Sequence, residues 1–185
     1  TTETFFAPRK YTLDEFIQNQ KFIFLALHGG VGEDGTIQKI LEKKKVKYNG
    51  SNGEVSHLCM DKFETAVAIN KLKIPGVHTA HQELIKMVSL PNVDLLWTEL
   101  TKKLQAKTII VKPRADGCSA GIVRLFSAKD LAQYITLIQS GATHIKPNTF
   151  KNQHEIVDMP TEKVEELLFE NFIETDNLKI KGAKL

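Results

Sequence analysis

The sequence predicts an α/β fold in its first part and an α+β arrangement in its second part. In the first part, the continuous apolar run KFIFLAL at 21–27 precedes the glycine-rich segment HGGVGEDG and then a helical stripe, TIQKILEKKK. A strand that is apolar on both faces is typical of a parallel sheet covered by helices. In the second part, TIIVKP and IVRLF flank the glycine-bearing loop RADGCSAG and predict a hairpin.

Composition places the chain among ordinary globular proteins. Its 185 residues are 42% hydrophobic and 25% charged, and the net charge of +3 gives no strong bias toward polyanions, so nucleic-acid binding is not implied. The longest apolar run, Phe22–Leu27, is far below the roughly 20 residues that a bilayer crossing requires, so no membrane role is expected. Cys59 and Cys118 lie far apart and no apolar signal stretch opens the chain. Free thiols in a reducing cytoplasm are therefore predicted.

Turn signals and helical periods divide the chain. VKYNGSNG carries two turn signals, Asn49-Gly50 and Asn52-Gly53, and the run 54–72 is helical in period. We therefore expect a domain of residues 1–55 and a second of residues 56–185. Thr12 is the expected cap of a short helix. Further along, Ser127 and Asp130 are expected to cap a helix at 127–139, and LLFENFI at 167–173 is expected to form a strand.

One reading of the glycine loop is a serine hydrolase. GCSAG fits the pattern G-x-S-x-G around Ser119, the segment 28–30 is similar to an esterase oxyanion loop, and a triad of Ser119, Asp130 and His154 can be drawn. The context argues against it, because a nucleophile elbow needs a strand, a sharp turn and then a helix. Here a polar segment precedes the motif and the β-type run IVRLF follows it.

The other reading treats the same loop as a cover for phosphate groups. Gly117 and Gly121 let the backbone approach a ligand closely, and the Ser119 hydroxyl and the loop amides can donate to phosphate oxygens. Lys112, at the end of the preceding strand, adds a compact positive charge. No P-loop is present, since the pattern G-x-x-x-x-G-K-[ST] does not occur there. A plain hairpin turn explains the loop equally well.

Five motifs in order favour the phosphate reading: HGGVGEDGTIQ, YNGSN, CMDK, IIVKPRADGCSAG and LLFENFIETD. Together they resemble the D-alanine–D-alanine ligases of the ATP-grasp superfamily over roughly residues 21–180. The segments GCSAG and FENFIETD are most similar to the plant and chlamydial branch of that family. The resemblance implies a partial ATP-grasp fold. A remnant of the parallel N-terminal domain would precede a central subdomain that carries a glycine-rich hairpin lid.

The resemblance assigns the phosphate-binding residues. The lysines of the M-D-K and V-K-P motifs, here Lys62 and Lys112, would hold the phosphates of ATP. The lid of the family reads G-S-S-x-G, so Gly117, Cys118 and Ser119 occupy its first positions. Cys118 departs from the family's serine, and because a thiol donates weakly, the departure puts that side-chain contact in doubt.

The resemblance also assigns the adenine-binding hinge. Glu170, the Asn171 carbonyl and the Ile173 amide would bind the edge of the base. Asp176 is the nearest acid for the ribose hydroxyls, although a residue-by-residue match falls on Asn177. An acid in the turn T-D-N is an equally good explanation of Asp176.

The HGGVGEDG motif matches the family's site for the first D-alanine. His28 and Glu33 correspond to the residues that flank this small zwitterion, and Glu33 and Ser119 take the catalytic roles that the resemblance implies. Asp34 is expected instead to accept a hydrogen bond from a first-turn amide of the helix that begins near Thr36.

The implied reaction uses ATP and Mg²⁺ to join two D-alanines through an acylphosphate, in the synthesis of peptidoglycan precursors. The family's metal ligands have no counterpart here, and neither does its first strand, so we expect a central portion of the enzyme that is inactive alone. D-Serine and D-lactate remain open as second substrates. A non-catalytic nucleotide-binding module, or a degenerate homologue, is the alternative. Exposed sheet edges favour self-association, which allows a homodimer.

Overall fold

The computed structural model describes residues 9–90, 92–114 and 119–172. The chain divides into two compact units, Thr1–Met60 and Asp61–Leu185. Their boundary follows Met60, slightly beyond the limit at residue 55 that the sequence suggests. No helix among the described residues is long and apolar enough to cross a bilayer.

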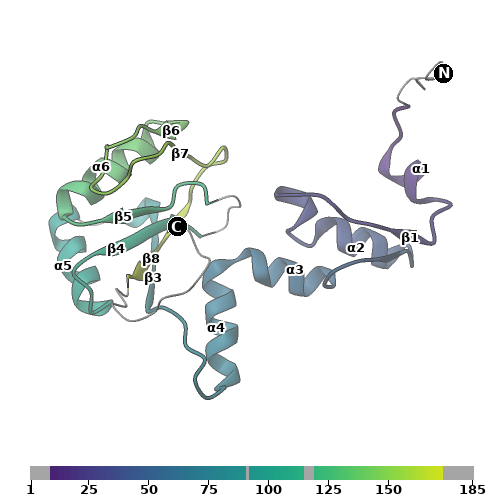
Figure 1. The fold of residues 1–185 in the computed structure, drawn as a ribbon, viewed down its shortest axis with the longest axis horizontal. Helices are drawn as coiled ribbons and strands as arrows, with labels where there is room; N and C mark the ends of the chain where they lie inside the picture. Colours follow the sequence, from purple (N-terminus) through teal and green to yellow (C-terminus); the bar gives the residue numbers. More distant parts are fainter. Residues whose placement is uncertain (1–8, 91, 115–118, 173–185) are drawn as a thin grey trace. The chain divides into compact units, whose positions relative to one another are not determined.

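The first unit is a small α/β arrangement (Figure 1). Its elements are α1 (Leu13–Ile17), β1 (Phe22–Ile23), the 3-10 helix η1 (Gly30–Gly32), α2 (Thr36–Lys43), β2 (Lys47–Tyr48) and α3 (Gly53–Met60). Strands β1 and β2 pair in parallel, as expected. The buried core consists of four aliphatic side chains, those of Ile17, Ile37, Leu41 and Val46. Thr12 caps α1 in a capping box with Glu15, which confirms the predicted start of that helix.

The strand expected to be buried on both faces is buried on one face only. Phe22 and Phe24 are 54% and 71% exposed, whereas Ile23 and Leu25 pack against the core of the unit. Side chains alternate between the faces of a strand, and the two-stranded sheet has its core on only one of them. The prediction of a fully buried strand is therefore wrong, because an apolar run does not require that both faces of the strand are covered.

The second unit is built on a four-stranded antiparallel sheet in the order β3-β8-β4-β5. Its strands are β3 (Gln82–Lys86), β4 (Ile109–Pro113), β5 (Val123–Leu125) and β8 (Glu166–Asn171). Its helices are α4 (Lys62–Leu72), the 3-10 helix η2 (Met87–Ser89), α5 (Val93–Lys103) and α6 (Ala128–Gln139), and β6 (His144–Ile145) pairs with β7 (Val157–Asp158). Figure 1 shows α5 and α6 together on one side of the sheet.

The two faces of this sheet differ in character. Alternate strand residues enter the core beneath α5 and α6, and they include Val111, Leu167 and Phe169, each 0% exposed. Their neighbours along the strands lie on the opposite face, where the register aligns Gln82 with Glu170. The face opposite the helices, termed the polar face, carries Gln82, Lys112 and Glu170 together with apolar side chains, among them Leu168, which is 0% exposed.

The helical run at 54–72 is interrupted. One helix ends at Met60 and another begins at Lys62, because the Asp61 carboxylate accepts hydrogen bonds from the Phe63 and Glu64 amides, each at 3.0 Å. An aspartate in this position is a strong N-cap. The sequence-based expectation of a single helical run is therefore wrong at Asp61.

The predicted hairpin and the predicted helix after it are confirmed. Strands β4 and β5 pair in antiparallel fashion around the glycine loop. The Ser127 hydroxyl accepts from the Asp130 amide, and the Asp130 carboxylate accepts from the Phe126 amide at 2.8 Å. Side chains of α6 at helical spacing, among them Leu131 and Tyr134, are buried in the core as expected.

Candidate functional site

A largely buried ion pair lies on the polar face of the second unit's sheet. The Lys112 Nζ is 2.7 Å from Oε2 of Glu170, and the two side chains are only 15% and 14% exposed. Gln82, on the neighbouring strand β3, donates its side-chain amide to Oε1 of the same carboxylate. Both carboxylate oxygens are therefore held. The structure brings together Lys112 and Glu170, which sequence reasoning selected separately, and adds Gln82, which it missed.

The end of β8 is fixed by its own hydrogen bonds. The Asn171 amide donates to the His81 carbonyl at 3.2 Å, and the Asn171 side-chain oxygen accepts from the His81 amide at 2.9 Å. Just beyond it, the guanidinium of Arg124 lies 3.7 Å from the centroid of the Phe172 ring. The other two hinge residues expected from the sequence, Ile173 and Asp176, lie outside the described residues.

The glycine loop is anchored at its far end. Gly121 has φ +68°, donates its amide to the Asp158 carbonyl at 2.7 Å and accepts the Tyr134 hydroxyl at 2.7 Å. The Gly121 amide is therefore used inside the protein and is not available to a phosphate. Ser119, at φ +58°, is also in the left-handed region. Gly117 and Cys118 lie outside the described residues.

Removing the Tyr134 hydroxyl should loosen this anchor. Tyr134 is fully buried, and burial raises the pKa of its phenol, so the hydroxyl stays protonated and keeps donating to Gly121. We expect Tyr134→Phe to lower the free energy of unfolding of this unit by about 1–3 kcal/mol, since it leaves a buried carbonyl without its donor. Urea unfolding followed by the fluorescence of Trp97, the single tryptophan, measures this.

Tyr48→Phe is the matched control. It removes an exposed hydroxyl that donates to Glu42 in the first unit, and it should leave the Trp97 transition unchanged. Equal midpoints for the Tyr134→Phe variant and the parent chain would contradict the anchoring role.

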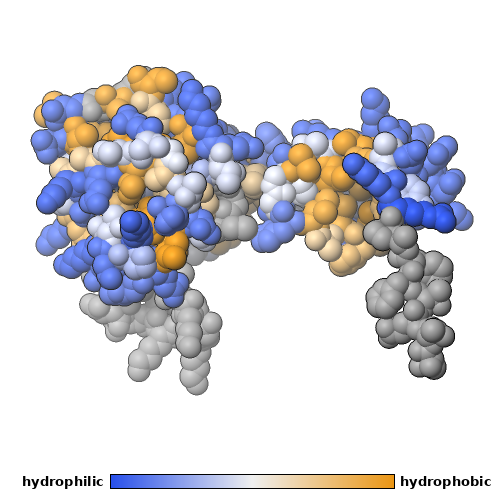
Figure 2. Space-filling model, turned by 90° about the horizontal axis from the view of Figure 1, so that it is seen from above, coloured by the Kyte–Doolittle hydropathy of each residue, from blue (hydrophilic) through white to orange (hydrophobic). Residues whose placement is uncertain are grey.

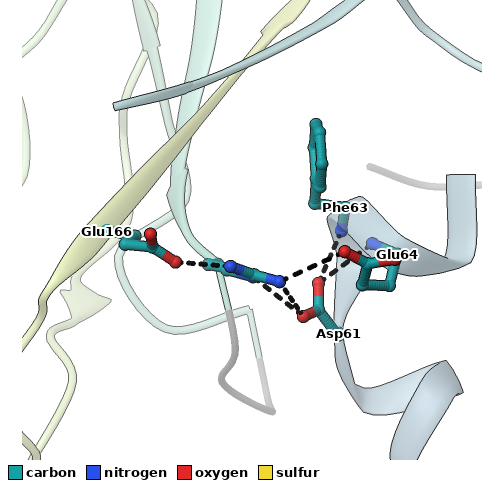
Figure 3. Close-up of polar contacts among 5 residues, drawn as sticks. Asp61, Phe63, Glu64 and Glu166 are labelled. Atoms are coloured by element: carbon teal, nitrogen blue, oxygen red, sulfur yellow. Dashed lines mark hydrogen bonds and ion pairs between the residues drawn. The ribbon is translucent and has the colours of Figure 1, made fainter. Parts of the chain in front are cut away.

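Arg114, which directly follows β4, pairs with carboxylates at the start of α4 and of β8. Figure 3 shows its partners Asp61, Glu64 and Glu166. Its guanidinium contacts Oδ2 of Asp61 at 2.7 Å, Oε2 of Glu166 at 2.6 Å and Oε1 of Glu64 at 3.5 Å. Burial would raise the pKa of Asp61, but the Arg114 hydrogen bond and the Glu64 amide hold it below its ordinary value. Asp61 and Glu166 in turn raise the pKa of Arg114. Lys62, the expected phosphate ligand, is the first residue of α4, and its amide donates to the Arg114 carbonyl at 3.4 Å.

Sequence reasoning did not select Arg114 or its carboxylate partners. The signal available was local: an aspartate within the helical run at 54–72, and an arginine immediately after the V-K-P strand. Neither signal indicates that the two residues meet across a separation of 53 positions.

In the first unit, the structure brings together the two residues expected to flank D-alanine. The His28 Nδ1 is 3.0 Å from Oε1 of Glu33, whose other oxygen accepts the Gly29 amide at 2.8 Å. The hydrogen bond with His28, followed by that from the Gly29 amide, lowers the pKa of Glu33. Asp34 accepts from the Thr36 amide at 2.8 Å, as expected, although Gly35 is the N-cap residue itself.

The hydrolase reading fails on its geometry. Strand β5 follows the loop, whereas a nucleophile elbow requires a helix there. The Asp130 carboxylate caps α6, and the His154 ring lies 3.3 Å from the side-chain oxygen of Asn148. These contacts do not assemble a triad with Ser119.

The donors on the polar face suit a nucleotide better than a metal. An ammonium group and a carboxylate held at 2.7 Å offer a cation for phosphate and an acceptor for an exocyclic amine. Within 9–90, 92–114 and 119–172, no group of three or more His, Cys, Asp and Glu side chains could hold a metal ion.

Comparisons with known proteins find similar sequences and similar folds. Residues 2–51 match the family model described as the D-ala D-ala ligase N-terminus. A D-alanine–D-alanine ligase of Carboxydothermus hydrogenoformans is 35% identical over 118 residues, which are 64% of this chain and 36% of the relative. D-alanine–D-alanine ligase A of Bacillus cereus is 36% identical over 130 residues, 70% of this chain and 40% of the relative.

Solved structures extend the match across both units. The crystal structure of the Bacillus anthracis D-alanine–D-alanine ligase is 26% identical with a TM-score of 0.63, covering 88% of this chain and 43% of that one. The structure of the same enzyme complexed with ATP is 25% identical with a TM-score of 0.60, covering 88% and 44%. The chain thus spans about two fifths of the length of these relatives. On sequence and fold together, the chain is similar to part of the D-alanine–D-alanine ligases.

Proposed function

We propose that the chain is part of an ATP-dependent ligase that joins two D-alanines into the dipeptide used for peptidoglycan precursors. The observation that carries the proposal is the buried pair of Lys112 and Glu170 on the polar face of the sheet. The relatives' names, and the ATP bound in one structural neighbour, support the choice of substrates.

In the proposed reaction, a carboxylate oxygen of the first D-alanine attacks the γ-phosphorus of ATP. The bond from this phosphorus to the β–γ bridging oxygen breaks, and ADP leaves. The amine of the second D-alanine then attacks the acyl carbon, phosphate departs, and the amine gives up a proton. Transfer of this kind depends on positioning and on charge neutralisation more than on covalent help from the protein.

In this proposal, Lys112 and Glu170 bind different parts of the nucleotide. Lys112 pairs with phosphate oxygens, and its ammonium reduces the repulsion that an incoming carboxylate meets. Glu170, held in place by Gln82, accepts from the exocyclic amine of adenine. Lys62 adds a second cation from the start of α4, and Ser119, with Gly117 and Cys118 before it, covers the phosphates.

The remaining residues complete the assignment. Asn171 and Ile173 bind the base edge through backbone groups, and Asp176 binds the ribose. His28 and Glu33 orient the first D-alanine, with the lowered pKa of Glu33 keeping a carboxylate for its ammonium. Mg²⁺ accompanies ATP and neutralises phosphate charge when bound.

The proposal places this chemistry in the cytoplasm, where ATP is available, and includes a homodimer. The exposed phenylalanines of the β1 segment, Phe22 and Phe24, support self-association. Light scattering at high protein concentration measures it, and a monodisperse monomer would argue against the homodimer.

Calorimetric titration of the 185-residue chain with Mg-ATP tests the nucleotide assignment. We expect saturable binding that weakens at least about tenfold in Lys112→Met, because a charge-assisted contact contributes about 1.5–3 kcal/mol. Lys103→Met is the control, since it removes a lysine of the same unit that is 55% exposed and pairs with Glu83. Equal affinities for the parent and Lys112→Met, or no binding by the parent, would overturn the assignment.

A further inference from the structure

Four charged side chains meet where α4 begins, next to Lys62 and two residues beyond Lys112 in the sequence. Asp61 is the N-cap of α4, Glu64 lies in its first turn, Glu166 is the first residue of β8, and all three contact the guanidinium of Arg114 (Figure 3). The side chains of Arg114, Asp61 and Glu166 are 28%, 20% and 20% exposed. Partly buried charges of this kind are held more strongly than surface pairs, because water screens them less.

The contacts divide the guanidinium between two elements. Nε and Nη2 bind Oδ2 of Asp61 at 2.8 and 2.7 Å, while Nη1 binds Glu166 at 2.6 Å. A single planar group with several fixed donors can make both contacts at once, whereas a lysine presents one point charge. The arginine therefore fixes a distance between the helix start and the strand, which a lysine does not do.

Asp61 gives this contact a direct effect on the helix. Its Oδ1 accepts the Phe63 and Glu64 amides, so one carboxylate begins α4 with one oxygen and binds Arg114 with the other. Backbone hydrogen bonds connect the same three segments. The Lys62 amide donates to the Arg114 carbonyl at 3.4 Å, and the Arg114 amide donates to the Glu166 carbonyl at 3.3 Å.

The charge balance favours a structural role for Arg114 over a contact with phosphate. One positive charge faces three carboxylates, so its charge is already more than matched. Without it, the three carboxylates would repel one another where α4 begins. Arg114 lies two residues beyond Lys112 along the chain.

We propose that Arg114 is a positioning residue of the nucleotide site, which holds the start of α4 against the ends of β4 and β8 and thereby sets Lys62 relative to Lys112. This inference rests on the proposed function, because it concerns where two phosphate-binding lysines stand. Replacing Arg114 therefore changes nucleotide affinity through the position of Lys62 and not through a contact with the ligand.

A mutant cycle on the full 185-residue chain tests the inference. Mg-ATP affinity is measured for the parent, Arg114→Met, Lys62→Ala and the double variant, with Lys103→Met as the charge-matched control. We expect Arg114→Met to weaken binding at least tenfold in the parent background. In the Lys62→Ala background the same change should have less than a threefold effect, because the residue through which Arg114 acts is gone. Arg114→Lys should recover little of the affinity.

Two further readouts separate positioning from general loss of structure. Trp97 fluorescence during urea unfolding establishes that each variant retains its fold. Hydrogen exchange of the peptide 61–66 reports on the first turn of α4, and we expect exchange at least tenfold faster in Arg114→Met and unchanged in Lys103→Met.

The outcomes distinguish this inference from the proposed function. Binding by the parent with additive losses in the cycle, or with unchanged exchange at 61–66, overturns the inference and leaves the proposed function standing. Absence of Mg-ATP binding by the parent overturns both. Non-additive losses with faster exchange support both.

Discussion

Gly35→Ala should unfold the first unit while leaving the second unit intact. Gly35 has φ +89°, and a Cβ added there would lie 2.1 Å from the Gly53 carbonyl oxygen, which is a backbone atom and cannot swing aside. The left-handed conformation alone costs an alanine about 1–2 kcal/mol. Separating the starts of α2 and α3 adds to this cost, so we expect a total of about 3 kcal/mol or more.

This loss is large for a unit whose buried core holds four aliphatic side chains. Hydrogen-exchange mass spectrometry of peptides from 36–43 and 53–60 should show near-complete loss of protection. The urea transition reported by Trp97, in the second unit, should stay where it is in the parent chain.

Gly50→Ala is the matched control for backbone strain. Gly50 has φ +95°, but a Cβ there would meet no atom within 4 Å, so only the conformational cost applies. We expect a loss of about 1–2 kcal/mol and a unit that remains folded. If Gly35→Ala and Gly50→Ala behaved alike, the close approach of Gly35 to Gly53 would have no energetic importance.

The glycines of HGGVGEDG therefore include one that the fold itself demands. From the sequence, the glycine-rich segment indicated only a loop before a helix. That Gly35 meets Gly53 could not be inferred, because this contact depends on how α2 and α3 pack.

Local signals predicted the elements that depend on local chemistry. Ser127 with Asp130 marked the start of α6, Thr12 marked α1, and the strand pattern around the glycine loop gave the β4–β5 hairpin. In each case a capping side chain or an alternating pattern lies within a few residues of the element that it determines.

Other local signals were present but were not used. Strand β3 and helix α5 were not anticipated, although Asn92 before a run with Leu96 and Leu100 at helical spacing is a helix-start signal. The Asn92 side chain accepts from the Asp94 amide at 3.0 Å, as such a cap should.

The site itself was predictable as a set of residues but not as an arrangement. Lys112 and Glu170 were selected from two motifs 58 positions apart, and their contact follows from the pairing of β4 with β8. The register that places Ile110 opposite Glu170 is a property of the whole sheet. Gln82 reaches the same carboxylate from a third strand, β3.

The Lys112–Glu170 pair allows stability and ligand binding to be separated. In Lys112→Met, the Glu170 carboxylate, which is 14% exposed, loses its ammonium partner and keeps the hydrogen bond from Gln82. Breaking a buried pair on one side costs about 3–5 kcal/mol, because the other charge loses its compensation. We expect a loss at the low end of this range, since Gln82 keeps donating, and a smaller loss for Glu170→Gln, which retains an acceptor.

The double variant should recover part of this loss. With both charges removed, no uncompensated ion is left in the sheet face, so the combined destabilisation should be at least about 1 kcal/mol less than the sum of the two single losses. Lys103 and Glu83, 55% and 29% exposed, form the control pair. Their coupling should be below about 1 kcal/mol, as is usual for solvent-exposed pairs. Urea unfolding with Trp97 fluorescence measures both cycles.

Nucleotide affinity should not follow the recovery of stability. If Lys112 binds phosphate, the double variant is more stable than expected from its parts and still binds Mg-ATP at least about tenfold more weakly than the parent, because the ammonium group is absent. If Lys112 serves only to neutralise Glu170, affinity should return together with stability. Additive stability losses would show that Lys112 and Glu170 are not energetically coupled. The ion pair would then no longer support the proposed nucleotide site.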